Sequence, residues 1–173
     1  STIAIKHPSC SFRLDANTLW DFDQVRFFWD GIRKHNLIDR IEYIEDPIDD
    51  PSKLANINDF PLALDQIIEK RWLDLPILKA IIIKPSLQGG VSGVKLWKQK
   101  THKLDVDLVL SSTFETSIGI GRMVQIADPN IVHGLGTLSW FAEDICSPLK
   151  QIDDLIYPHQ SSPKLSNYAQ REQ

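Results

Sequence analysis

The chain has 173 residues, of which 42% are hydrophobic and 24% are charged, a composition typical of a globular protein. Its net charge of −4 argues against binding nucleic acid through a basic face, and its longest apolar runs are too short to span a membrane. The two cysteines form no C-x-x-C pair, and no signal-peptide pattern is present. These features predict a cytoplasmic protein with no nucleic-acid partner and no membrane partner.

Six segments have the pattern of β-strands, and helical patterns lie between them. The strands are predicted at residues 10–17, 41–47, 61–66, 78–85, 106–113 and 131–136. Helices are predicted at residues 18–36, 52–58, near Trp72, after Gly89-Gly90, and at residues 115–127 and 138–145. The segment IAIKHPSC before the first strand has the pattern of a helix end. From residue 146 onward the periodicity is weak, which predicts a surface wrap or a frayed end.

The regular alternation of strand and helix predicts an α/β fold. The fourth strand, LKAIIIKP, is almost wholly apolar, as expected of a parallel strand buried on both faces. Two architectures remain open at this point, a doubly wound open sheet and a barrel.

Polar residues, and at the last strand a glycine, recur at or near the carboxyl ends of the six predicted strands, about one β/α unit apart. They are Asp15, Glu45, Asp65, Lys84, Ser111 and Gly134. In a parallel barrel these ends open on one face, where barrel enzymes place their chemistry. The pattern therefore predicts a charged site in an apolar scaffold.

Each of these residues taken alone has an ordinary structural interpretation. Asp15 can cap a following helix, Glu45 and Asp46 before Pro47 can be ordinary turn acids, and Asp65 can cap the next turn. Lys84 can extend from a strand end into water. Helix caps alone do not explain acids at three successive strand ends followed by a lysine at the fourth.

Three carboxylates at one place repel each other unless a cation neutralises them. Ligands that are all oxygen favour a hard cation, Mg²⁺ before Ca²⁺ or Zn²⁺. Such an ion can act as a Lewis acid on a substrate carboxylate, and a neighbouring lysine can move a proton. Together these groups predict proton abstraction next to the carboxylate of a small-molecule substrate.

Six motifs in this order resemble the o-succinylbenzoate synthase family of the enolase superfamily. They are RLDAN (13–17), IEDP (44–47), LD (64–65), IIIKPSLQGG (81–90), SSTFETSIG (111–119) and GLGTL (134–138). The resemblance runs from about residue 8 to residue 142. It implies a partial TIM-like (β/α)7β barrel, strands three to eight, in residues 1–145, followed by a C-terminal tail at 146–173.

The resemblance also implies roles for individual residues. Mg²⁺ is implied as the cofactor, held by Asp15, Glu45 and Asp65. Lys84 is implied as the catalytic lysine that stabilises an enediolate. The implied substrate-binding residues are Arg13, Asn17, Ser111, Ser112 and Gly134.

The family's activity is that of a carbon–oxygen lyase in menaquinone biosynthesis. It dehydrates 2-succinyl-6-hydroxy-2,4-cyclohexadiene-1-carboxylate to o-succinylbenzoate. An N-acylamino acid racemase or a dipeptide epimerase acting at the same site is an alternative.

The chain departs from the family at several places. The family's base, in a K-x-K motif upstream of RLDAN, does not occur in this sequence. We therefore expect this chain alone to bind metal poorly and to turn over little, with the N-terminal portion of the same enzyme as its partner. An inactive fragment that associates with another chain is a further alternative. Gln66-Ile67 stands where the family has Glu-Ser, and Gly136 where it often has an acid.

Overall fold

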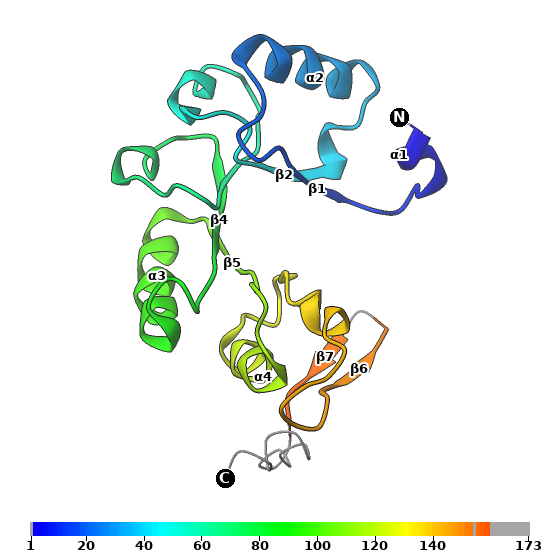
Figure 1. The fold of residues 1–173 in the computed structure, drawn as a ribbon. Helices are drawn as coiled ribbons and strands as arrows, with labels where there is room; N and C mark the ends of the chain where they lie inside the picture. Colours follow the sequence, from blue (N-terminus) through cyan, green and yellow to red (C-terminus); the bar gives the residue numbers. More distant parts are fainter. Residues whose placement is uncertain (1, 154, 160–173) are drawn as a thin grey trace. The chain divides into compact units, whose positions relative to one another are not determined.

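The computed structural model describes residues 2–153 and 155–159, and Figure 1 shows its elements. Five strands follow one another in the sheet in the order β1-β2-β3-β4-β5. Their bounds are β1 Phe12–Asp15, β2 Ile41–Glu45, β3 Leu62–Leu64, β4 Leu78–Ile83 and β5 Asp107–Leu110. The pairs β1–β2, β2–β3 and β3–β4 are parallel, which confirms the predicted α/β class with parallel strands.

The chain divides into two compact units. The first comprises Ser1–Ile82 and Thr101–Asp107, and the second comprises Ile83–Lys100 and Leu108–Gln173. The predicted boundary between a barrel region and a tail at residue 146 stays a prediction. Among the described residues, no helix combines the length and the apolar character needed to cross a membrane.

The longest helix of the first unit is α2, Phe22–Lys34. The helix begins where Asp21 accepts a hydrogen bond from the Gln24 N–H and the Gln24 side chain accepts one from the Asp21 N–H. Val25 and Trp29, one turn apart in this helix, are buried, and the Trp29 ring meets Phe60 edge-on at 5.3 Å. These two side chains therefore join the helix to the core.

Helix α2 is shorter than the predicted span of residues 18–36. Asn17 and Thr18 have φ angles of 49° and 58°, so the chain turns there before the helix can begin. The remaining elements of this unit are α1 Thr2–Lys6 and the 3₁₀ turns Ile38–Arg40, Pro51–Leu54 and Lys70–Trp72. The helix predicted before the first strand is confirmed by α1, whereas two short predicted helices are single 3₁₀ turns.

The second unit contains α4 Ser117–Ile126, the 3₁₀ helix Gly136–Trp140 and a hairpin of β6 Lys150–Ile152 with β7 Leu155–Tyr157. Helix α3, Gly90–Leu104, begins in this unit. The helix predicted at residues 138–145 is wrong beyond Trp140, where the chain continues without helix. The hairpin lies in the segment predicted to be a tail, and residues 160–173 lie outside the described residues.

The sixth strand predicted at residues 131–136 is also wrong, because only one bridge forms there, between Ser111 and Gly134. The Leu110 N–H donates to Nδ1 of His133 at 3.0 Å, so an imidazole ring serves as its acceptor. The Gly134 N–H donates to the Leu110 carbonyl, and the Gly134 carbonyl accepts a hydrogen bond from the Ser112 N–H. The His133 side chain thus takes the place of a main-chain acceptor, and regular strand pairing does not continue beyond the single bridge.

The loop between β4 and α3 packs tightly onto the start of the helix. Gly89 and Gly90 have positive φ angles, and a Cβ built at Gly93 would lie 1.8 Å from the main-chain oxygen of Gln88. A backbone oxygen cannot move aside as a flexible side chain can. The close approach of the loop therefore requires glycine at position 93.

The loops that follow β4 and β5 are joined by one carboxylate. Glu115 accepts hydrogen bonds from the Ser86 hydroxyl, from the Thr113 hydroxyl and from the Thr113 N–H at 2.7 Å. Burial opposes ionisation of this group, but the hydrogen bonds outweigh it and lower the pKa of Glu115 below its usual value. The ionised carboxylate therefore stabilises this loop pair.

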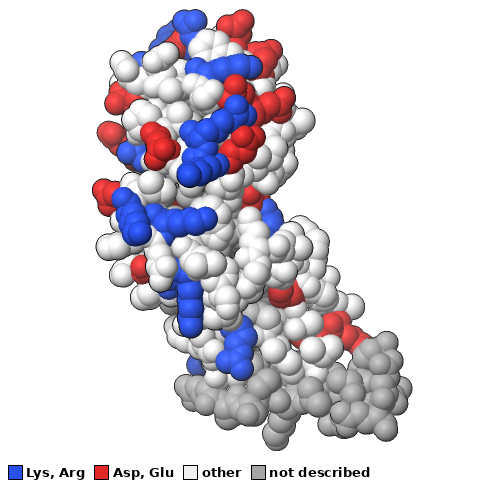
Figure 2. Space-filling view, turned by 90° about the vertical axis from the view of Figure 1, so that its left-hand side faces the viewer, with Lys and Arg blue, Asp and Glu red and all other residues white. Residues whose placement is uncertain are grey.

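Both signs of charge occur on the face shown in Figure 2, where Lys and Arg side chains are interspersed with Asp and Glu. This mixture accords with the modest net charge of −4.

Gly93→Ala is expected to lower the free energy of unfolding by roughly 1–3 kcal/mol, because the added methyl group overpacks against the Gln88 carbonyl. Gly31→Ala is the matched control, since a Cβ at this helical glycine meets nothing within 4 Å. The control should raise stability by up to ~1 kcal/mol. Urea unfolding of both variants measures the difference, and a Gly93→Ala protein as stable as the wild type would contradict this packing.

Glu115→Gln is expected to destabilise the protein at pH 7 by about 1 kcal/mol, because the amide cannot accept all the hydrogen bonds of the carboxylate. Since the folded-state pKa is lowered, this stabilisation is present above the unfolded-state pKa and is lost as the pH falls through the folded-state value. Urea unfolding across the acidic range should show the variant and wild type converging. Glu143→Gln, at an exposed position, is the control. A difference in stability that does not change with pH would show that the ionised Glu115 carboxylate is not its cause.

Candidate functional site

The first two candidate acids are register partners at the ends of adjacent parallel strands. Asp15 ends β1 and pairs with Glu45, which ends β2. Residues paired in a parallel ladder place their side chains on the same side of the sheet. The Asp15 carboxylate also accepts a hydrogen bond from the Asn17 N–H at 2.9 Å. Asp15 is exposed and Glu45 is half-buried, so this corner of the sheet faces solvent.

Asp65 follows directly after the next strand, β3. Glu45 pairs with Ala63 in β3, and Asp65 lies two residues later, beyond the last strand residue Leu64. The structure thus brings the three predicted ligands to neighbouring strand ends. Within residues 2–153 and 155–159, however, no three acidic, histidine or cysteine side chains are grouped so that they could hold an ion. Their assignment as metal ligands stays a prediction.

A fourth acid, Asp46, is buried between these strand ends. Its two carboxylate oxygens accept hydrogen bonds from the Asp65 N–H at 3.1 Å and from the Gln66 N–H at 2.7 Å. Burial raises the pKa of Asp46 above its usual value, the hydrogen bonds oppose the rise, and the nearby charges of Asp65 and Asp15 add to it. Sequence reasoning treats Asp46 as an ordinary turn acid, and its place next to Glu45 is the signal in the sequence that marks it.

Arg13 and Asn17 lie on either side of Asp15. Arg13 forms an ion pair with Glu42, and its guanidinium lies 4.9 Å from the centre of the Tyr43 ring. Burial raises the pKa of Tyr43 to about 12, although the charge of Arg13 opposes this. The Asn17 side chain accepts a hydrogen bond from Nε2 of Gln66 at 3.1 Å, which links the end of β1 to the end of β3. Asn17 thus supports this corner, and substrate contact by either residue stays a prediction.

Lys84 follows directly after β4 and belongs to the second unit. Its N–H donates to the Gln88 side chain at 2.7 Å, which begins the turn into the loop before α3. The residue is half-buried. The carbonyl of Ile83, the residue before Lys84, accepts a hydrogen bond from the Ser111 N–H at 2.9 Å. Lys84 is therefore held at the end of its strand next to the start of the Ser111-Ser112 segment.

The three other candidate residues of the second unit lie together. Both the N–H and the hydroxyl of Ser112 donate to the Gly134 carbonyl, at 2.8 Å and 3.0 Å, and the Thr137 hydroxyl donates to the Ser112 hydroxyl. A Cβ at Gly134 would lie 3.3 Å from the Ser111 hydroxyl. Because Gly134 has no side chain, the Ser111 hydroxyl has room beside it. The binding role of all three residues stays a prediction.

No protein-family model matches the chain. Among curated proteins, it is 31% identical over 144 residues to an o-succinylbenzoate synthase from Yersinia enterocolitica, covering 76% of this chain and 43% of that protein. It is 28% identical over 166 residues to the chloroplastic protein PHYLLO from Arabidopsis thaliana, covering 77% of this chain and 9% of that protein. The chain thus spans less than half the length of either relative.

Among solved structures, muconate lactonizing enzyme matches with a TM-score of 0.80 and 19% identity, covering 99% of this chain and 52% of that one. At this identity the likeness shows the fold alone. It decides between the two predicted architectures in favour of the barrel. Solved epimerases and racemases share the fold as well. The chain has an α/β fold like part of the barrel of these solved enzymes, and its sequence is similar to those of o-succinylbenzoate synthases.

Proposed function

We propose that the protein is an Mg²⁺-dependent o-succinylbenzoate synthase. It would dehydrate 2-succinyl-6-hydroxy-2,4-cyclohexadiene-1-carboxylate to o-succinylbenzoate as a step of menaquinone biosynthesis. The observation that carries the proposal is the similarity, over about three quarters of this chain, to proteins of that name. Because the chain spans less than half of those proteins, the activity is proposed for the full-length protein.

The donor set at the ends of β1, β2 and β3 fits a hard cation in its chemistry. Asp15, Glu45 and Asp65 offer only carboxylate oxygens, at the ends of neighbouring strands, which lie about 4.8 Å apart in a sheet. When bound, Mg²⁺ would act as a Lewis acid on the substrate carboxylate.

The remaining roles belong to side chains of this chain. The Lys84 ammonium would stabilise negative charge that develops on the substrate when a proton leaves the carbon next to its carboxylate. Ser111, Ser112 and Gly134 would contact the succinyl arm, since their hydrogen-bonded arrangement presents small polar groups. Arg13 and Asn17 would hold the end of β1. We assign the base that removes the proton to none of the described residues.

Asp15→Asn and Glu45→Gln in the full-length protein should each weaken Mg²⁺ binding by more than ~100-fold, because loss of an outer partner of a metal ligand already costs roughly 10–100-fold. Titration calorimetry with Mg²⁺ measures the affinity, and turnover of the cyclohexadiene should fall with it. Asp49→Asn, at an exposed position in the loop after β2, is the control and should behave as the wild type. If either ligand variant bound Mg²⁺ with wild-type affinity, the cation site would not lie at these residues.

Lys84→Ala should lower turnover by at least ~100-fold, the typical cost of losing a group that stabilises developing charge. Circular dichroism should show an unchanged fold, and Lys79→Ala, at an exposed position of the same strand, should retain activity. An unchanged rate for Lys84→Ala would mean that this residue has no part in the reaction.

Assays of the full-length protein with both substrate classes test the reaction itself. Dehydration of the cyclohexadiene is expected. Racemisation of N-succinylamino acids or epimerisation of dipeptides, with the cyclohexadiene unchanged, would instead establish the alternative activity.

A further inference from the structure

We propose that Asp46 is a positioning residue, whose buried carboxylate fixes the main chain at Asp65 and thereby sets the direction of the third carboxylate of the site. The inference rests on the proposed function, because it concerns the same three carboxylates. It adds to the site a residue that supports a ligand.

The carboxylate of Asp46 accepts the hydrogen bonds of the main chain directly beyond the end of β3. Strand β3 ends at Leu64, and the next two N–H groups, those of Asp65 and Gln66, both donate to Asp46. Each of its oxygens accepts one of these bonds, and bonds to a charged acceptor are stronger than those between neutral groups. Two consecutive peptide units are thereby held, and their positions set where the Asp65 side chain begins.

The main chain of Asp46 is held equally firmly. Its N–H donates to the Ala63 carbonyl at 3.1 Å, and its carbonyl accepts from the Thr18 N–H at 2.6 Å. One residue at the end of β2 therefore binds the chain after β1 and the chain of β3. Its φ of 39° turns the backbone at this point, in a region where aspartate and asparagine are tolerated better than most residues.

The network closes through two amide side chains and the first carboxylate. Gln66, held by Asp46, donates from Nε2 to the Asn17 side chain, and the Asn17 N–H donates to the Asp15 carboxylate. A continuous path of hydrogen bonds thus joins Asp46 to Asp65 on one side and to Asp15 on the other. All of its members lie in the first unit.

The same geometry distinguishes positioning from direct ligation. Both oxygens of Asp46 are already engaged by N–H groups, and only 5% of the residue is exposed. Asp15 is exposed and Asp65 is half-buried, so their carboxylates are the accessible ones. A substrate or cation that approached from solvent would meet these groups and not Asp46.

Asp46→Asn tests the proposal with little change in shape. Asparagine tolerates the positive φ, but its amide has only one acceptor oxygen, so one of the two N–H groups loses its partner. In the full-length protein the Mg²⁺ dissociation constant should rise roughly 10–100-fold, as for other partners of metal ligands. Titration calorimetry with Mg²⁺ alone measures it.

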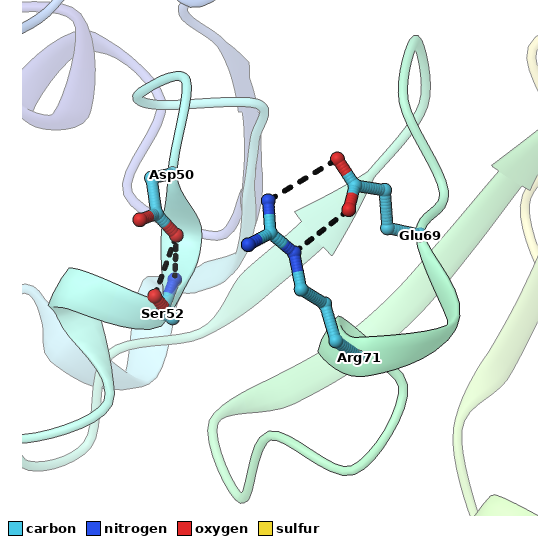
Figure 3. Close-up of polar contacts among 4 residues, drawn as sticks. All are labelled: Asp50, Ser52, Glu69 and Arg71. Atoms are coloured by element: carbon cyan, nitrogen blue, oxygen red, sulfur yellow. Dashed lines mark hydrogen bonds and ion pairs between the residues drawn. The ribbon is translucent and has the colours of Figure 1, made fainter.

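Asp50→Asn is the matched control, with the same change of charge and shape four residues along the chain. As Figure 3 shows, the Asp50 carboxylate also accepts two hydrogen bonds, from the N–H and the hydroxyl of Ser52, but these serve only the local turn. Its Mg²⁺ affinity should equal that of the wild type. Urea unfolding of both variants shows whether a change in affinity merely follows a change in stability.

Amide hydrogen exchange in the metal-free protein gives a readout that does not depend on Mg²⁺. The N–H groups of Asp65 and Gln66 should exchange faster in Asp46→Asn and at the wild-type rate in Asp50→Asn. Unchanged exchange, or unchanged affinity in Asp46→Asn, would overturn the proposal. A loss of affinity well beyond ~100-fold, as expected for the ligand variant Asp15→Asn, would overturn it in favour of direct ligation.

Failure of the proposed function gives a different result. If the wild type binds no Mg²⁺, the cation site itself is wrong, and with it the role of Asp46 toward a ligand. Faster exchange in Asp46→Asn would then show that Asp46 holds the main chain in a protein without that site.

Discussion

The register of the parallel ladder from β1 to β3 is the constraint on which the candidate site depends. It pairs Asp15 with Glu45, so these two side chains share one side of the sheet, and it pairs Glu45 with Ala63, two residues before Asp65. A shift of one residue in the ladder of β1 and β2 would place one of the two paired acids on the opposite side. The hydrogen bonds of Asp46 and Asn17 reinforce this register at the point where the ladders end.

The second unit holds its polar residues by a different means. There Glu115 joins the loops after β4 and β5, and Gly134 meets the Ser111-Ser112 segment through main-chain and hydroxyl hydrogen bonds. Strand pairing is sparse here, because the His133 ring accepts the Leu110 N–H within the ladder. Side-chain hydrogen bonds thus do in this unit much of what the parallel ladder does in the first.

The five strands β1 to β5 could be predicted because each has either alternating or continuous apolar residues between turn residues, and the local pattern suffices for that. The sixth strand could not be excluded in the same way. Residues 131–136 have a suitable pattern, but whether they pair depends on where His133 and Gly134 meet β5, a contact more than twenty residues away along the chain. The start of α2 was misplaced for a local reason, since the left-handed turn at Asn17 and Thr18 is rare outside glycine.

The sequence by itself determined which acids follow which strands, the α/β class and the similarity to o-succinylbenzoate synthases, because motif order and apolar periodicity are properties of the chain alone. Only the tertiary structure decided that Asp15 faces Glu45 in register and that the buried Asp46 binds two N–H groups of the next strand. Both depend on main-chain atoms of separate strands meeting in space. The side-chain types alone make Asp46 no different from any other acid before a proline.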